Sequence, residues 1–135
     1  MKKRVVVDTN ILVSAALSPN GNPAKIIALI SSGEEIQVYY SREILAEYKD
    51  VLSRQKLNIA AETQTRIMNA IISTGTLITP TSSEIPLPDE SDRVFYDTAK
   101  ESGAVLITGN TKHFPEEDFI VTPSQFLELF LRILG

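Results

Sequence analysis

The chain has 135 residues, the size of one ordinary domain, which is long enough to bury a single hydrophobic core. Its 17 acidic residues outnumber its 13 basic residues, and the formal net charge of −4 argues against a protein that binds nucleic acid through overall charge. Cysteine is absent, no signal-peptide pattern opens the chain, and no apolar run approaches the roughly 18 residues of a membrane span. We therefore expect one cytoplasmic domain, residues 1–135, without membrane association.

The first predicted strand ends at an acidic residue. Residues 5–7 are three consecutive valines, a pattern typical of a strand buried on both faces of a parallel sheet. Asp8 follows directly, and apolar residues return at helical spacing from Ile11, so residues 8–10 are predicted to form a turn between strand and helix. In a parallel sheet this turn lies at the carboxyl edge, where such sheets bind ligands. Asp8 is a candidate functional residue, although a plain turn role fits Asp-Thr-Asn alone about equally well.

The rest of the chain alternates between predicted helices and strands. After the helix that ends near Leu17, helices are predicted over residues 23–32, 41–54, 60–73, 91–102 and 123–134, and strands over residues 36–40, 76–79, 104–108 and 119–121. Ser41 and Ser91 are the expected N-cap residues of their helices, and the proline-rich residues 80–88 are predicted to form a surface loop. Alternating strands and helices indicate the α/β class, a parallel sheet with helices on both faces in three layers, α/β/α.

The final predicted helix, residues 123–134, is apolar on nearly all sides. One face should cover the sheet. The other is either buried against the domain, which is the more common outcome, or a homodimer surface.

Helical geometry selects two further acidic residues. With successive residues about 100° apart, Glu47 lies at the edge of the apolar stripe of its helix. The same geometry, applied to residues 91–102, places Asp92 beside the buried stripe and Asp97 on the solvent side. Glu47 and Asp92 are therefore candidates, Asp97 is predicted to be solvated, and Asp89 is interpreted as a capping or loop residue.

One more polar group follows the strand predicted over residues 104–108, in Thr108-Gly109-Asn110. If this strand is parallel to the first, Asn110 emerges at the same edge as Asp8. Gly109 suits a sharp turn beside a ligand because it lacks a Cβ atom. Asn110 is a candidate of second rank, and a plain turn role stays open.

Several carboxylates held at one edge repel one another unless protons or cations intervene. Oxygen ligands without cysteine favour hard ions, which here means Mg²⁺ or Mn²⁺. Such a site can activate water for attack on a phosphodiester while the cation stabilises the developing charge. The predicted chemistry is metal-assisted phosphodiester hydrolysis.

The sequence resembles the PIN-domain family in four segments spread over the whole chain. They are V-V-V-D-T-N-I-L-V-S-A around Asp8, L-A-E-Y around Glu47, D-E-S-D-R-V-F-Y-D-T-A around Asp92 and L-I-T-G-N-T-K-H-F-P around Asn110. The resemblance implies about five parallel strands, ribonuclease activity on RNA, and an acidic triad of Asp8, Glu47 and Asp92 that binds Mg²⁺ or Mn²⁺. It also implies frequent homodimers and, for toxin-like members, a small antitoxin protein as partner.

The resemblance is incomplete at Asn110. Many PIN domains carry a fourth carboxylate there, and a neutral amide puts a second metal ion in question. His113, the only histidine, is interpreted as a loop or packing residue despite its closeness to Asn110. The candidate substrate contacts are Thr9, Asn10, Arg42, Thr108 and Lys112, although scattered basic residues on an acidic protein are more often simply solvated.

Two other functions stay open. The first is a catalytically silent PIN scaffold that binds RNA or protein. The second is a phosphotransfer or phosphatase-type α/β protein, which also places an aspartate after its first strand. Receiver domains of that kind need a carboxylate pair after this strand, and the phosphatases usually need aspartate where Asn10 stands, so this function is disfavoured.

Overall fold

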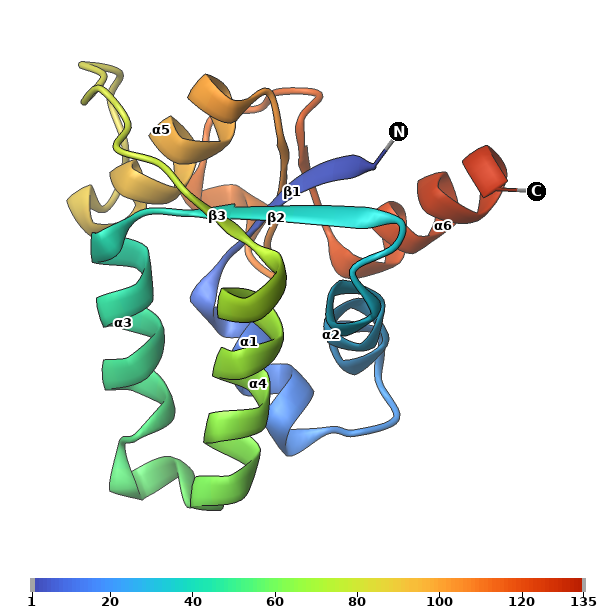
Figure 1. Cartoon of the computed structure of the whole chain (residues 1–135). Coiled ribbons are helices and arrows are strands. Elements are labelled where there is room, and N and C mark those ends of the chain that lie inside the picture. The colour runs from blue at the N-terminus through green and yellow to red at the C-terminus, as the bar shows by residue number, and fades with distance from the viewer. Residues whose placement is uncertain (1, 135) are drawn as a thin grey trace.

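The computed structural model describes residues 2–134 and the side chains of residues 2–130. Its centre is a parallel five-stranded sheet with the strand order β3-β2-β1-β4-β5 (Figure 1). The strands are β1 (Lys3–Val7), β2 (Ile36–Tyr40), β3 (Thr76–Leu77), β4 (Val105–Ile107) and β5 (Ile120–Val121). The predicted α/β class and the parallel sheet are thereby confirmed.

Helices cover both faces of the sheet. They are α1 (Thr9–Leu17), α2 (Asn22–Ser32), α3 (Arg42–Leu52), α4 (Ala61–Thr74), α5 (Arg93–Ser102) and α6 (Pro123–Leu134), with short 3₁₀ helices η1 (Gln55–Leu57), η2 (Glu90–Asp92) and η3 (Thr111–His113). Helix α5 lies on one face, while α1, α2 and α4 lie on the other (Figure 1). The result is the three-layer arrangement predicted from the alternation of elements.

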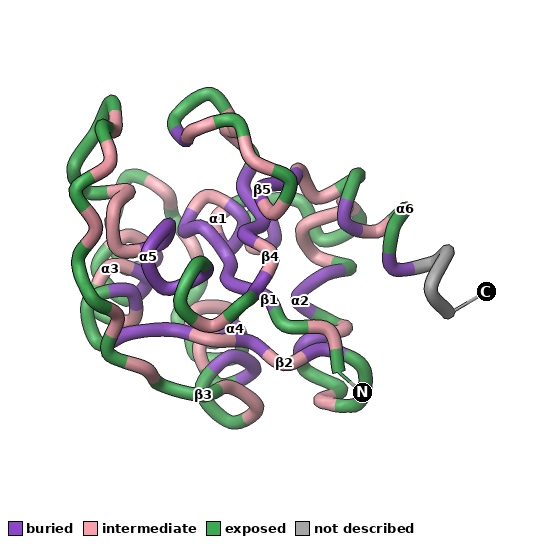
Figure 2. Tube along the Cα trace, turned by 90° about the horizontal axis from the view of Figure 1, so that it is seen from above, coloured by how far each residue is buried: buried purple, intermediate pink, exposed green. Residues whose placement is uncertain are grey.

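Strand β1 is the middle of the sheet and of the core. Val5, Val6 and Val7 are completely buried, because β2 and β4 flank the strand and helices cover both its faces. Buried residues gather along β1, β2, β4 and the adjoining face of α5 (Figure 2). The chain builds β2 and β3 on one side of β1 and then returns to build β4 and β5 on the other. The carboxyl ends of β1 and β4 therefore lie at the point where the strand order reverses, the usual ligand site of such sheets.

One of the two predicted N-cap residues is confirmed. Oγ of Ser41 accepts the N–H of Ile44 at 3.1 Å and caps α3, as expected. The expectation for Ser91 was wrong, because Oδ1 of Asp89 caps η2 by accepting the N–H of Ser91 at 3.0 Å. An aspartate is at least as good a cap as a serine, and it shifts the start of α5 to Arg93.

The inner face of α6 packs as predicted. Phe126 and Phe130 are buried, and their rings stack with centroids 5.8 Å apart. The apolar residues Leu131, Ile133 and Leu134 of this helix lie outside the described side chains, and the homodimer surface stays a prediction. Within residues 2–134, no helix has both the length and the apolar character needed to cross a membrane.

Candidate active site

Asp8 lies at the junction of β1 and α1, and hydrogen bonds connect it to α1 and to the end of β4. Its N–H donates to the carbonyl of Ile107 at 2.9 Å, its Oδ1 accepts the N–H of Thr9 at 2.8 Å, and its Oδ2 accepts the hydroxyl of Thr108 at 2.7 Å. The side chain is almost completely buried. Burial raises the pKa of Asp8, against the opposing effects of the Thr108 and Thr9 hydrogen bonds and of His113.

Glu47 reaches the same edge from α3. It is half-buried, consistent with its predicted place beside the apolar stripe, and its Oε2 accepts the hydroxyl of Thr9. Thr9 therefore contacts Asp8 through its backbone and Glu47 through its side chain. Because Thr9 is buried and its hydroxyl is used in this way, the expectation that it contacts substrate is corrected to a role in orienting Glu47.

Asp92 is the last residue of η2 and directly precedes α5. Its side chain is 14% exposed, and among the described residues its buried Oδ2 has no hydrogen-bond partner. Nδ1 of His113 lies 3.7 Å away, which is too far for a hydrogen bond. Burial raises the pKa of Asp92 to about 6, and the charges of Asp8, Asp89 and Glu47 act in the same direction against His113. Asp92 is thus a carboxyl group in an environment that disfavours its charge.

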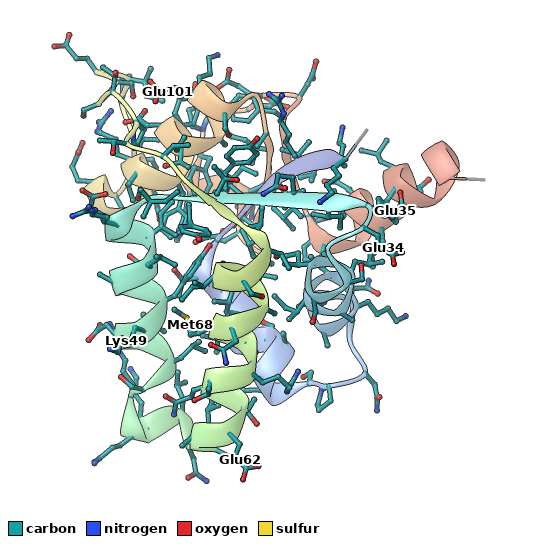
Figure 3. All side chains as sticks on the ribbon, in the orientation of Figure 1. Glu34, Glu35, Lys49, Glu62, Met68 and Glu101 are labelled. Atoms are coloured by element: carbon teal, nitrogen blue, oxygen red, sulfur yellow. The ribbon has the colours of Figure 1, made fainter. Side chains whose placement is uncertain are left out.

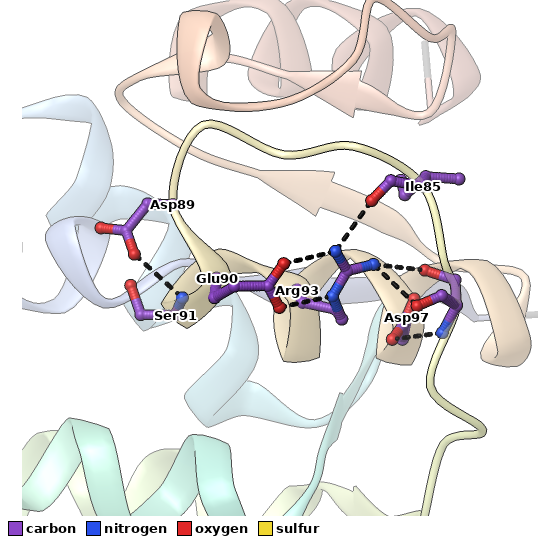
Figure 4. Close-up of polar contacts among 7 residues, drawn as sticks. Ile85, Asp89, Glu90, Ser91, Arg93 and Asp97 are labelled. Atoms are coloured by element: carbon purple, nitrogen blue, oxygen red, sulfur yellow. Dashed lines mark hydrogen bonds and ion pairs between the residues drawn. The ribbon is translucent and has the colours of Figure 1, made fainter.

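Arg93 fastens η2 and the preceding loop to α5 (Figure 4). Its guanidinium makes five hydrogen bonds: two to the Glu90 carboxylate at 2.6 and 2.7 Å, one to the Ile85 carbonyl at 2.8 Å, and two to the carbonyl and hydroxyl of Ser83 at 2.7 and 3.2 Å. The planar fork of an arginine matches this set of oxygens, which an ammonium group cannot reach together. The turn that carries Asp92 is therefore held by its neighbour in sequence.

Asp97 is buried, although helical geometry predicted a solvated side chain. It accepts the backbone N–H of Ser83 at 3.0 Å, so the loop over residues 80–88 covers this side of α5 (Figure 4). The prediction was wrong because it counted only the sheet as a packing partner of the helix. Asp97 therefore has a structural role in holding the loop.

We predict that Arg93→Lys lowers the free energy of unfolding by about 1.5 kcal/mol, because two loop carbonyls lose their donors. Arg54→Lys is the matched control, since Arg54 forms a single exposed ion pair with Asp50 and should change stability by less than about 0.5 kcal/mol. Urea unfolding of the two variants measures the difference. Equal stability of both variants would show that the five-bond arrangement does not hold the loop.

Asn110 and His113 complete the edge on the side of β4. The backbone N–H of Asn110 donates to Oγ1 of Thr108 at 3.0 Å, which links it to Asp8, and its Nδ2 lies 2.9 Å from Nε2 of His113. Because an amide Nδ2 only donates, Nε2 accepts, and the proton of neutral His113 lies on Nδ1, towards Asp92. His113 is about half exposed and lies beside two candidate residues, and its interpretation as a loop or packing residue stays a prediction.

The remaining candidate substrate contacts differ in exposure. Thr108 is completely buried, so its expected contact with substrate is corrected to a role behind Asp8. Oδ1 of Asn10 accepts the N–H of Gly109 at 3.1 Å and joins the two turns at the carboxyl edge. Lys112 is exposed in η3, beside His113.

Arg42 is exposed at the start of α3. Among the described side chains it makes no hydrogen bond or ion pair with any other candidate residue. Its contact with substrate stays a prediction.

The acidic residues outside this edge are mostly solvated. Glu34, Glu35, Glu62 and Glu101 are exposed and lie at the periphery of the molecule (Figure 3). The net negative charge is therefore carried largely by outward-facing side chains, whereas the candidate carboxylates are partly or fully removed from solvent.

The structure brings Asp8, Glu47 and Asp92 to one edge but does not assemble them as ligands. Within residues 2–130, no group of three or more acidic, histidine or cysteine side chains forms a ready metal site. That the three carboxylates share one ion therefore stays a prediction, and one Glu47 oxygen is hydrogen-bonded to the Thr9 hydroxyl. The donors nevertheless fit Mg²⁺ or Mn²⁺, since all are oxygens and Oδ2 of Asp92 is buried without a partner.

Comparisons with known proteins place the chain among PIN domains. A protein-family model described as a PIN domain matches residues 4–112, a range that includes Asp8, Glu47, Asp92 and Asn110. The uncharacterized protein MJ1680 of Methanocaldococcus jannaschii is 32% identical over 150 aligned residues, which cover 100% of this chain and 96% of the relative.

Two solved structures have a similar fold. PAE2754 from Pyrobaculum aerophilum matches with a TM-score of 0.63 and 15% identity, over 96% of this chain and 90% of that one. VapBC2 from Rickettsia felis, solved bound to a DNA fragment from its promoter, matches with a TM-score of 0.56 and 17% identity, over 88% of this chain and 96% of that one. At these identities the likeness concerns the fold alone.

Proposed function

Because the chain belongs to the PIN-domain family, we propose that it is an endoribonuclease that hydrolyses RNA phosphodiester bonds and depends on Mg²⁺ or Mn²⁺. PIN domains are generally nucleases and typically use a divalent metal ion. One observation carries the proposal: Asp8, Glu47 and Asp92 come from separate elements to the carboxyl edge, where the strand order reverses.

Asp8, Glu47 and Asp92 would hold the cation, with Asn110 in second rank as a neutral oxygen donor. When bound, the ion supplies a Lewis acid that stabilises negative charge on the reacting phosphate. The protein's own contribution is orientation. The Thr108 hydroxyl and the Thr9 N–H fix the two oxygens of Asp8, and Oδ2 of Asp92, which accepts no hydrogen bond from the residues the structure describes, is available for a new bond.

Two neighbouring residues have proposed roles towards RNA. His113 presents an N–H towards Asp92 and is half exposed, so it can donate a hydrogen bond to a phosphate oxygen near the carboxylates. Lys112 is exposed next to it and can neutralise an adjacent phosphate. Lys112 supplies local positive charge on a protein that is negative overall.

We extend the proposal to a toxin of a toxin–antitoxin pair, with a small antitoxin protein as partner and a homodimer as the assembly. Family membership supports this extension, as does the fold likeness to VapBC2. Growth arrest on expression of the chain, absent for a variant without cleavage activity, would test the toxin role separately from the chemistry.

A catalytically silent PIN scaffold is the second candidate. Two observations favour it: Glu47 is held by Thr9, and Asn110 is an amide where many family members carry a carboxylate. A silent scaffold would bind RNA without cleaving it.

We predict that the purified protein cleaves a single-stranded RNA with a fluorophore and a quencher at its ends in the presence of Mn²⁺ or Mg²⁺. Excess EDTA should stop the reaction, because the carboxylates alone cannot neutralise the developing charge. A DNA strand of the same sequence is the substrate control. Cleavage that continues in EDTA would contradict metal dependence, and binding of the RNA without cleavage in Mn²⁺ would favour the scaffold.

A further inference from the structure

Tyr48 follows Glu47 in α3 and is completely buried. Its hydroxyl donates a hydrogen bond to the carbonyl of Val7, the residue that precedes Asp8. Sequence periodicity places Tyr48 only in the apolar stripe of its helix, which explains the ring but not the hydroxyl. The hydroxyl joins the helix that carries Glu47 to the last residue of the strand that leads to Asp8.

The carbonyl of Val7 lies where β1 loses one of its neighbours. The pairing of β1 with β2 ends at Val5 and Val38, whereas the pairing with β4 continues to Val7 and Ile107. A buried carbonyl without a hydrogen-bond partner costs free energy of folding. The hydrogen bond from the Tyr48 hydroxyl avoids this cost, and it fixes the distance between α3 and β1.

The ring of Tyr48 makes the third connection. It packs against Phe95 with the ring centroids 6.3 Å apart and the planes tilted by 44°. Phe95 is completely buried in α5, three residues after Asp92. Tyr48 thus follows Glu47 directly and contacts Val7, which precedes Asp8, and Phe95, which lies three residues after Asp92.

We propose that Tyr48 is a positioning residue that sets the relative positions of Asp8, Glu47 and Asp92 and so determines how tightly the site binds a divalent cation. The proposal rests on the proposed metal-dependent function. Tyr48 itself touches neither the cation nor RNA, because it is buried beneath the carboxylates. Its effect is therefore expected on cation affinity and turnover, and not on RNA affinity.

Tyr40 provides a matched control. It is also buried, and its hydroxyl donates to a backbone carbonyl, that of Ile72, at 3.3 Å. The Ile72 carbonyl belongs to α4, which carries none of the candidate carboxylates. Tyr40→Phe therefore removes the same kind of hydrogen bond without touching the elements of the site.

The test compares Tyr48→Phe, Tyr40→Phe and the parent protein by calorimetric titration with Mn²⁺ in the absence of RNA. We expect Y48F to weaken Mn²⁺ binding by about tenfold, the size typical of residues that orient metal ligands, and Y40F by less than about twofold. Both variants should melt at lower temperature than the parent without metal. In RNA cleavage, Y48F should lower kcat and leave KM unchanged.

Two outcomes separate this proposal from the proposed function. A parent protein that binds no Mn²⁺ overturns the function and the positioning role with it. A parent that binds Mn²⁺, together with a Y48F variant that binds it equally well, overturns the positioning role alone. Phe95→Leu is the second variant. It leaves the hydroxyl of Tyr48 in place and removes only the contact between the rings of Tyr48 and Phe95. If Y48F does not fold, unchanged Mn²⁺ affinity of Phe95→Leu overturns the proposal, and a loss of about threefold or more supports it.

Discussion

Replacing Asp8 with asparagine is expected to lower the rate of Mn²⁺-dependent RNA cleavage at least about a thousandfold, equivalent to about 4 kcal/mol of transition-state stabilisation. Asp8 is the carboxylate held most firmly at the edge, with its two oxygens oriented by Thr9 and Thr108. An amide keeps the size of the side chain but removes the charge that a cation needs. Cleavage with labelled RNA at saturating Mn²⁺ measures the loss.

The fold of this variant should be preserved. Asparagine is as good an N-cap as aspartate, so the hydrogen bond from the Thr9 N–H survives. Burial raises the pKa of Asp8, which means that its charge costs stability, and the melting temperature of Asp8→Asn should equal or exceed that of the parent. Inactivity combined with a higher melting temperature would separate loss of chemistry from loss of structure.

Asp50→Asn is the control for this prediction, because Asp50 is an exposed residue of α3 whose ion pair with Arg54 lies in solvent. It should cleave RNA at the parent's rate. An Asp8→Asn variant that also cleaves at the parent's rate would remove Asp8 from the proposed site.

The frame of the fold could be predicted because it depends on local patterns. The valine run predicts β1 and the serine cap predicts the start of α3 without any distant contact. Placing Asp8 at the carboxyl edge followed from the same reasoning. The family resemblance and the fold agree on the place of Asp8.

The unpredicted features depend on contacts between residues far apart in the chain. Asp97 is buried by a loop that helical geometry does not include, and Thr108 is turned inward by Asp8, 100 residues away. The Tyr48 hydroxyl binds the Val7 carbonyl at a point of β1 that the pairing with β2 does not reach. Glu47 was correctly placed at the edge of the apolar stripe of its helix, but its hydrogen bond to Thr9 could not be derived from residue spacing.

Asp92 gives the stability of the metal-free protein a pH dependence that Asp92→Asn should abolish. The pKa of Asp92 is raised from 3.8 to about 6 in the folded protein, so between these values the folded state binds more protons than the unfolded state. The stabilisation from this group is complete below about pH 4 and is lost as the pH rises through 6. Asp89 and Glu90 act in the opposite direction, since hydrogen bonds from Ser91 and Arg93 respectively lower their pKa values.

The difference between parent and variant isolates Asp92 from those opposing groups. Asp92→Asn should match the parent at pH 4 and exceed it at pH 7 by on the order of 3 kcal/mol in urea unfolding. A difference that stays constant from pH 4 to pH 7 would show that the carboxyl of Asp92 is not in a charge-disfavouring environment.

At pH 7 a divalent cation should make the parent more stable than Asp92→Asn. Mn²⁺ at about 1,000 times its dissociation constant stabilises a protein that binds it only when folded by about 4.1 kcal/mol, which exceeds the cost of charging Asp92. We expect this gain in the parent and little of it in Asp92→Asn, because the partnerless oxygen of Asp92 is the donor that an ion would use. Mg²⁺ in place of Mn²⁺ should act in the same direction. Equal stabilisation of parent and variant would mean that the cation binds elsewhere.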